Sequence, residues 1–159
     1  MSELTLEWRE AVKSRIEKIL DQQPSKNPGT IRLGRHPDLC DILFPNDEKI
    51  SRLHAEIFFN CEQNSFYLRK LPEGKRPLIV DGEIITHGEV SLRQGSTIIL
   101  GETEIKVVAV FVDLAYGLIC PNIKCRNPDK RRIVDPKHLL EGCPWCGTSL
   151  AAAQSFHRS

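Results

Sequence analysis

Long apolar runs, catalytic motifs and a glycine-rich phosphate loop are all missing from this sequence of 159 residues. No apolar stretch approaches the roughly 20 residues that a bilayer-spanning helix requires, so no membrane span is expected. There is no Gly-x-Ser-x-Gly motif, and no glycine-rich loop leads into a Lys-Ser or Lys-Thr pair. Neither a serine hydrolase nor a P-loop nucleotide-binding protein is therefore expected. We predict that the protein is not an enzyme.

A secretory signal is also missing, because no basic segment followed by an apolar core stands at the N-terminus. We therefore expect a cytoplasmic location. The composition, with 40% hydrophobic and 27% charged residues, is typical of a folded globular protein. The net charge of +1 is unevenly placed: residues 1–119 hold 15 basic and 18 acidic residues, whereas residues 120–159 hold 7 and 3. This asymmetry indicates two modules of different chemistry.

The N-terminal segment, residues 1–24, carries apolar side chains at spacings of three and four, from Leu4 to Leu20, with charged residues between them. This spacing predicts an amphipathic α-helix. The helix would end before Pro24, which cannot continue it. Its apolar stripe would either pack on the neighbouring domain or bind a second protein.

The apolar period changes to two after Gly29, and turn residues separate a series of short apolar runs. Many short strands at this spacing predict an all-β sandwich over residues 28–113. The expected strands cover residues 30–33, 41–44, 54–60, 66–71, 78–80, 89–92, 97–100 and 105–112.

Four motifs within this β segment occur in a fixed order. They are Gly34-Arg35, Ser51-Arg52-Leu53-His54, Val80-Asp81-Gly82, and the segment Leu92–Gly101, which has glycine at its fourth and last positions. The combination resembles the forkhead-associated (FHA) domain family across residues 29–112. The resemblance implies an antiparallel β-sandwich that binds phosphothreonine peptides. It also implies that Arg35 and Ser51 contact the phosphate, while Gly34 and His54 support the site.

The residue chemistry agrees with this resemblance. A phosphothreonine carries a charge of about −1.5 to −2 and three acceptor oxygens, so its reader needs a fixed cation and several donors. A guanidinium in the turn after a strand, such as that of Arg35, offers a planar fork of donors. The Ser51 hydroxyl can donate as well. Arg52 is either a second phosphate contact or a solvated charge.

One departure from the family pattern lies at Lys75-Arg76-Pro77. Family members have an asparagine where Arg76 stands, and an asparagine amide offers the ligand backbone both a donor and an acceptor, whereas arginine offers donors only. Two outcomes stay open. The groove binds phosphothreonine with additional charge from Lys75 and Arg76, or it has lost the peptide and serves as a docking surface.

The C-terminal module, residues 117–150, holds four cysteines as Cys120-x4-Cys125 and Cys143-x2-Cys146, followed by a tail at 151–159. Two close cysteine pairs can place four thiolates around a zinc ion, and the arrangement resembles a zinc ribbon. We predict a structural Zn²⁺ site. A redox dithiol at Cys143 and Cys146 is the rival interpretation, but it would need a helix in a βαβ unit.

Basic residues between Cys120 and Leu150 outnumber acidic ones by six to three. A zinc ion with four thiolates contributes a charge of about −2, which offsets most of this excess. Nucleic acid is therefore not the expected partner, although a regulator acting on nucleic acid through the ribbon stays an alternative.

These observations predict a mainly β protein, an FHA-type sandwich with an N-terminal helix and a small C-terminal zinc ribbon. The predicted function is a signalling adaptor that recruits a phosphorylated protein, with a second protein possible at the helix or ribbon. A structural subunit with a degenerate groove is the alternative.

Overall fold

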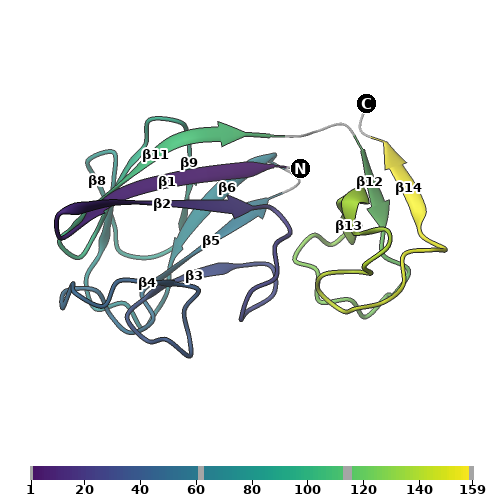
Figure 1. Cartoon of the computed structure of the whole chain (residues 1–159), viewed down its shortest axis with the longest axis horizontal. Coiled ribbons are helices and arrows are strands. Elements are labelled where there is room, and N and C mark those ends of the chain that lie inside the picture. The colour runs from purple at the N-terminus through teal and green to yellow at the C-terminus, as the bar shows by residue number, and fades with distance from the viewer. Residues whose placement is uncertain (1, 61–62, 113–115, 158–159) are drawn as a thin grey trace.

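The computed structural model describes residues 2–60, 63–112 and 116–157, and within them the regular secondary structure is almost entirely β-strand (Figure 1). Two sheets form a sandwich, and a third, smaller sheet lies beside one end of it. The prediction of a mainly β sandwich is confirmed. No described helical segment has the length and hydropathy needed to cross a bilayer.

The first sheet of the sandwich has the strand order β2-β1-β11-β10-β7-β8, and the second has the order β4-β3-β5-β6-β9. All neighbours are antiparallel except β3 and β4, which are parallel. The first sheet consists of β1 (Glu3–Glu10), β2 (Lys13–Leu20), β7 (Leu78–Val80), β8 (Glu83–Ile85), β10 (Thr97–Leu100) and β11 (Thr103–Phe111). The second consists of β3 (Ile31–Gly34), β4 (Ile42–Leu43), β5 (Ala55–Asn60), β6 (Ser65–Lys70) and β9 (Glu89–Leu92).

The expected N-terminal helix is wrong. Residues 3–20 form the hairpin of β1 and β2, in register from Glu3 opposite Leu20 to Glu10 opposite Lys13. Ala11, in the turn, has a φ of +57°, a backbone conformation suited to a tight turn and not to a helix. Because no helix forms in residues 3–20, the interpretation of this segment as a partner-binding helix is also wrong.

The hairpin forms because β1 has a second apolar period that matches a strand. Leu4, Leu6 and Trp8 alternate with polar residues and are buried in the sandwich core. On its other edge β1 pairs with β11 from Glu3–Phe111 to Trp8–Ile105, which satisfies its backbone groups. Ile16, in the predicted apolar stripe, is instead 59% exposed. Tertiary pairing overrides the local helical pattern here.

The third sheet has the order β13-β12-β14 and belongs to the C-terminal module. Its strands are β12 (Tyr116–Ile119), β13 (Ile133–Val134) and β14 (Gln154–His157), and a short 3₁₀-helix, η1 (Pro136–His138), follows β13. Strand β14 lies in the predicted tail and pairs with β12. The buried cluster of this module is small and includes Cys120 and Cys143.

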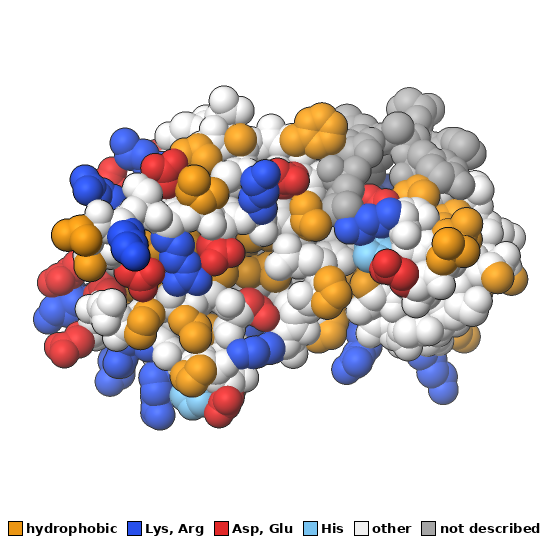
Figure 2. Space-filling view, viewed as in Figure 1, with side chains coloured by type: hydrophobic (Ala, Val, Ile, Leu, Met, Phe, Trp, Pro, Cys, Tyr) orange, Lys and Arg blue, Asp and Glu red, His pale blue; other side chains and the backbone are white. Residues whose placement is uncertain are grey.

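Charge is distributed differently over the two modules on the face that Figure 2 shows. Basic and acidic side chains are interspersed over the sandwich, whereas this face of the C-terminal module carries fewer charges. A broad field of one sign, which nucleic-acid binding favours, is therefore not present on this face.

Candidate functional site

The Arg35 side chain stands in the loop that follows β3. Its backbone N–H donates to the Ser51 carbonyl (3.2 Å), and its Nε donates to the Ile50 carbonyl. These bonds fix the guanidinium through Nε, so its two terminal nitrogens stay available to a ligand. Arg35 is exposed, and among the described residues no carboxylate pairs with it. An oriented, unpaired guanidinium of this kind suits a phosphate.

Ser51 and His54 connect this loop to the turn between β6 and β7. The Ser51 hydroxyl oxygen accepts from the Lys75 N–H at 2.9 Å, so its own proton stays free to be donated. The Ser51 N–H donates to Nδ1 of His54 (3.0 Å), and Nε2 of His54 lies 2.8 Å from the Arg76 carbonyl. An imidazole with an accepting Nδ1 and a donating Nε2 is neutral.

The environment of His54 keeps its ring neutral. The side chain is fully buried, and this loss of solvation lowers the pKa, against the opposing effect of the Arg76 carbonyl. His54 therefore ties two loops together through hydrogen bonds of fixed direction. Our prediction that it supports the Ser51 loop is consistent with this placement.

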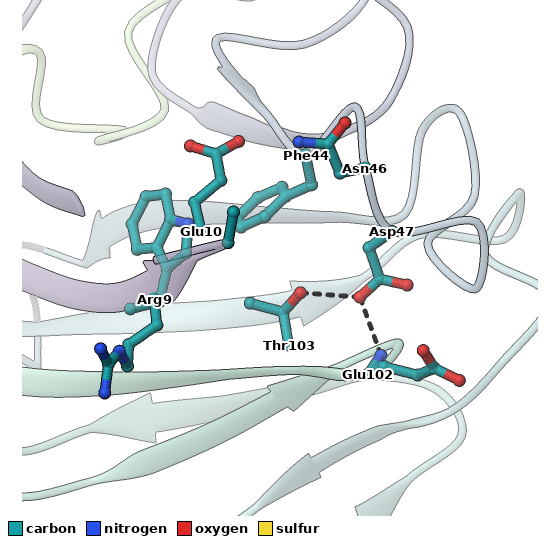
Figure 3. Close-up of a pocket in the computed structure, with 9 residues that line it drawn as sticks. Arg9, Glu10, Phe44, Asn46, Asp47, Glu102 and Thr103 are labelled. Carbon is teal, nitrogen blue, oxygen red and sulfur yellow. Dashed lines mark hydrogen bonds between the residues drawn. The ribbon is translucent and has the colours of Figure 1, made fainter. Parts of the chain in front are cut away.

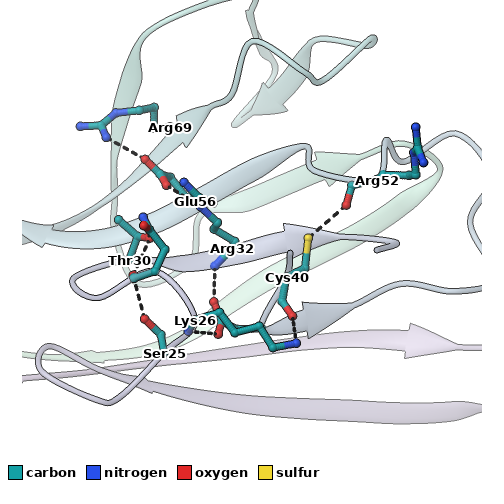
Figure 4. A network of polar contacts seen from close by, with 10 residues as sticks. Ser25, Lys26, Thr30, Arg32, Cys40, Arg52, Glu56 and Arg69 are labelled. Carbon is teal, nitrogen blue, oxygen red and sulfur yellow. Dashed lines mark hydrogen bonds and ion pairs between the residues drawn. The ribbon is translucent and has the colours of Figure 1, made fainter. Parts of the chain in front are cut away.

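Gly34 lies where the end of β3 passes close to the Ser51–His54 loop. A Cβ atom here would lie 2.3 Å from the Arg52 carbonyl oxygen and 2.7 Å from the Cys40 sulfur. The same carbonyl accepts from the Cys40 thiol at 3.1 Å and from the His36 N–H at 3.0 Å (Figure 4). A larger residue at position 34 would therefore displace the loop that carries Ser51.

Asp47 lies before Ser51 in the chain and attaches the loop that carries Ser51 to the turn between β10 and β11. The sequence did not indicate this role. Its carboxylate accepts from the Glu102 N–H at 2.8 Å and from the Thr103 hydroxyl at 2.7 Å, both at the turn between β10 and β11 (Figure 3). Burial alone would raise the pKa of Asp47, but hydrogen bonds from Thr103, Glu102 and Lys49 lower it. The only signal in the sequence was an aspartate near a turn, which is common.

These loops enclose an open groove of about 660 Å³ that contains every predicted phosphopeptide-binding residue. Lys49 also lines it, and sequence reasoning missed this residue. Arg52, Lys75 and Arg76 are exposed, and no ion pair of theirs occurs among the residues that the structure describes. The full lining is Arg35, His36, Leu39, Glu48, Lys49, Ile50, Ser51, Arg52, Leu53, Glu73, Lys75 and Arg76.

The four C-terminal cysteines converge on one point, with their sulfurs within 4.8 Å of one another. Cys120 lies 3.6 Å from Cys146, and Cys125 lies 3.6 Å from Cys143, so the short contacts join the two halves of the motif. All four are free thiols. Such a cluster can hold a metal ion. A dithiol at Cys143 and Cys146 alone is less consistent with these cross-half contacts.

The thiols titrate over a wide range because their surroundings differ. Burial raises the pKa of Cys120 to about 11 and raises that of Cys125 further. Burial would also raise the pKa of Cys146, but hydrogen bonds with the side chain and backbone of Thr148 lower it to about 6. A metal ion needs deprotonated thiolates, so its binding to this cluster would release protons.

The C-terminal module is attached to the sandwich by the Gln22 side chain, which forms hydrogen bonds with the backbone of the module. The Gln22 amide, 5% exposed, donates to the Ile133 carbonyl at 3.0 Å and accepts from the Asp135 N–H. It thereby satisfies two backbone groups at the edge of β13.

A second contact lies at Gly29, whose φ is +92°. A Cβ atom there would lie 2.6 Å from Cγ of Pro128 and 3.0 Å from Nε1 of Trp145. Because Gly29 precedes β3 and Arg35 follows it, the module and the groove lie at opposite ends of the sandwich (Figure 1).

Comparison with known proteins agrees with this architecture. Residues 31–101 match the model of the FHA domain. Comparison with the curated proteins found no match. The FHA domain of the CT664 protein from Chlamydia trachomatis is 25% identical, with a TM-score of 0.56, over 67% of this chain and 97% of that one.

Two further FHA structures are similar. The kinase-interacting FHA domain of the kinase-associated protein phosphatase KAPP from Arabidopsis is 22% identical, with a TM-score of 0.56, over 70% of this chain and 96% of that one. A structure from an analysis of phosphothreonine-dependent FHA domain interactions is 23% identical, with a TM-score of 0.52, over 70% and 97%. The sandwich of this protein is therefore an FHA domain.

Proposed function

We propose that this protein is an adaptor that recruits a phosphothreonine-containing partner through its FHA domain, without catalysing a reaction. The observation that carries the proposal is the arrangement of Arg35 and Ser51. Both are fixed through other atoms, Arg35 through Nε and Ser51 through its accepting oxygen, so that terminal guanidinium N–H groups and a hydroxyl proton remain for the phosphate. An FHA domain of similar structure comes from a study of phosphothreonine-dependent interactions, which supports the same ligand.

The groove fits such a ligand in size and charge. A volume of about 660 Å³ accommodates a phosphorylated side chain with its neighbouring residues. Arg52 stands on the same loop as Ser51 and is exposed, so it can add a second cation to the phosphate. Gly34 and His54 keep these loops in place.

The test is fluorescence anisotropy with a degenerate phosphothreonine peptide library and its unphosphorylated twin. The wild-type protein should bind the phosphorylated library in the micromolar range, and Arg35→Ala should abolish this binding. Arg93→Ala, an exposed arginine outside the groove, removes the same charge and should bind as the wild type does.

The alternative, a docking surface that no longer reads phosphate, gives a different result in the same experiment. Equal and negligible signals from the wild type and Arg35→Ala would support it and reject the adaptor proposal. The replacement of the family's asparagine by Arg76 is what motivates this alternative.

For the C-terminal module we propose a structural Zn²⁺ held by Cys120, Cys125, Cys143 and Cys146. Four thiolates at about 2.3 Å from a central zinc lie about 3.8 Å from one another in a tetrahedron, and the closest sulfur pairs here lie at 3.6 Å. When bound, zinc would crosslink the two halves of the motif. Elemental analysis of the purified protein should give one zinc per chain, and a metal-free, folded module would contradict the proposal.

A further inference from the structure

The charge of the groove exceeds that of one phosphothreonine. Five cations and two carboxylates line it, which gives a formal net charge of +3 from its Lys, Arg and Glu side chains. One phosphate contributes about −1.5 to −2 and would leave a positive groove. A further anion beside the phosphate would complete the charge balance.

Lys75 and Arg76 supply this excess, and their backbones are held firmly. The Lys75 N–H donates to Ser51, and the Arg76 carbonyl lies 2.8 Å from Nε2 of the buried His54. Each of these bonds ties its residue to the loop that carries Ser51. The backbones of Lys75 and Arg76 therefore stand at a fixed position next to the phosphate contacts, while their charged side chains are exposed and without an ion pair among the described residues.

Arg76 also changes what the groove can recognise. Arginine and lysine side chains donate hydrogen bonds and accept none, so they bind carboxylate or phosphate oxygens and cannot pair with a peptide N–H. Pro77 follows Arg76 and has no N–H to offer. This wall of the groove thus favours anionic side chains of the ligand.

We infer that the preferred ligand is a phosphothreonine with a second anionic group close to it in the sequence, and that Lys75 and Arg76 select this ligand. The inference rests on the proposed phosphothreonine recognition. The second group can be a carboxylate from Asp or Glu or a second phosphate, since both present oxygens that a guanidinium binds.

The experiment compares four peptides by anisotropy: phosphothreonine with neutral neighbours, with Asp neighbours, with a second phosphothreonine, and the unphosphorylated Asp peptide. The second and third should bind about fivefold to tenfold more tightly than the first, because two partly exposed cations gain one or more partners. In the double variant Lys75→Gln/Arg76→Gln, the second and third peptides should bind no more tightly than the first. The affinity for the neutral phosphopeptide should fall by less than the affinities for the two more anionic phosphopeptides.

A matched double variant, Lys13→Gln/Lys106→Gln, removes the same charge from exposed positions on β2 and β11 that do not line the groove. It should retain the full preference. If this control lost the preference equally, net charge and not Lys75 and Arg76 would be responsible, and the assignment would be overturned.

The outcomes separate the two proposals. Equal affinity for all three phosphopeptides would overturn the inference and leave phosphothreonine recognition intact. Binding of the unphosphorylated Asp peptide as tight as that of its phosphorylated form would overturn the proposed function itself, as would a failure of every phosphopeptide to bind. A gain confined to either the Asp peptide or the doubly phosphorylated peptide would support the inference and identify the source of the second anion.

Discussion

The sandwich and the C-terminal module differ in the size of the apolar cluster that each of them buries. The sandwich buries a continuous cluster from both sheets, including Leu4, Ile57 and Ile105, each fully buried. The cluster of the C-terminal module is much smaller, and Cys120 and Cys143 are part of it. A short segment cannot bury enough apolar surface to offset the entropy of ordering its chain. We therefore expect apolar burial to hold one module and a metal ion to hold the other.

The largest effect on stability is expected from loss of the proposed metal ion, which should unfold the C-terminal module and leave the sandwich folded. Cys125→Ser removes one ligand, and structural zinc supplies about 10–16 kcal/mol of apparent binding free energy in small zinc modules. The resonances of residues 117–150 should collapse in a ¹⁵N HSQC spectrum while those of the sandwich persist. Cys40→Ser, a buried cysteine outside the cluster, should keep the metal. Dispersed C-terminal resonances in the metal-free protein would contradict this comparison.

Truncation in the core should have the next largest effect, and in the sandwich only. Leu6→Ala removes a fully buried side chain from β1 and should lower the free energy of unfolding by about 2–5 kcal/mol. Ile16→Ala, on the exposed part of β2, should change it by less than about 0.5 kcal/mol. Urea denaturation of both variants measures this difference. Similar losses for the two would favour a helical arrangement of residues 4–20.

Asp21, near the junction of the two modules, should make stability depend on pH. Burial raises its pKa to about 6, with a smaller contribution from Asp135, and one of its oxygens is buried without a partner among the described residues. The folded state thus binds the proton more tightly than the unfolded chain. The ionised carboxylate costs stability above about pH 6, and this cost fades as the pH falls toward 3.8.

Asp21→Asn should accordingly stabilise the protein by about 1–2 kcal/mol near pH 8 and have little effect near pH 4. An asparagine oxygen can still accept from the Ser2 N–H, which Asp21 accepts at 3.2 Å. Thermal unfolding of both proteins at several pH values tests the sign. A gain that is constant over the whole range would show that the carboxylate is not the cause.

The smallest effect is expected where the modules touch. Gln22→Ala removes two hydrogen bonds between the modules, and because the Asn127 amide still donates to the Ile133 carbonyl, the cost should be only about 0.5–1 kcal/mol. The two modules should then tumble more independently, which ¹⁵N relaxation would report as different correlation times. Gln23→Ala, which removes the acceptor of the Leu20 N–H within the same turn, is the control. Unchanged, equal correlation times in Gln22→Ala would show that other contacts hold the junction.

The strands of the sandwich could be predicted because alternation of buried and exposed residues is a local signal. That signal was ambiguous in residues 4–20, since Leu4 and Trp8 fit both a helical and a strand period. The deciding contact is the pairing of β1 with β11, about 100 residues away, which no local pattern reveals. Strand β8 escaped prediction because Glu83 and Ile84 are both exposed there.

The cysteine cluster and the groove also differ in how much of each a local sequence pattern reveals. The four cysteines could be predicted as one cluster because their pairs are close in sequence and the required geometry is simple. The groove could be predicted only in its motif residues. Lys49 and Asp47 belong to no motif, and they reach the site through the fold of the loop before Ser51. The attachment of the C-terminal module through Gln22 depends on residues 111 positions apart and had no sequence signal.

The neutral His54 determines what a pH titration of ligand binding measures. Its hydrogen bonds with Ser51 and Arg76 require the uncharged ring, and burial lowers its pKa below the ordinary value of 6.5. A phosphothreonine, by contrast, takes up a proton with a pKa of about 6 and loses half of its charge. A loss of affinity as the pH falls through 6 would therefore report the protonation of the ligand and not of His54. In a complex with a phosphothreonine, acidification would weaken the phosphate contact while His54 keeps its hydrogen bonds to both loops.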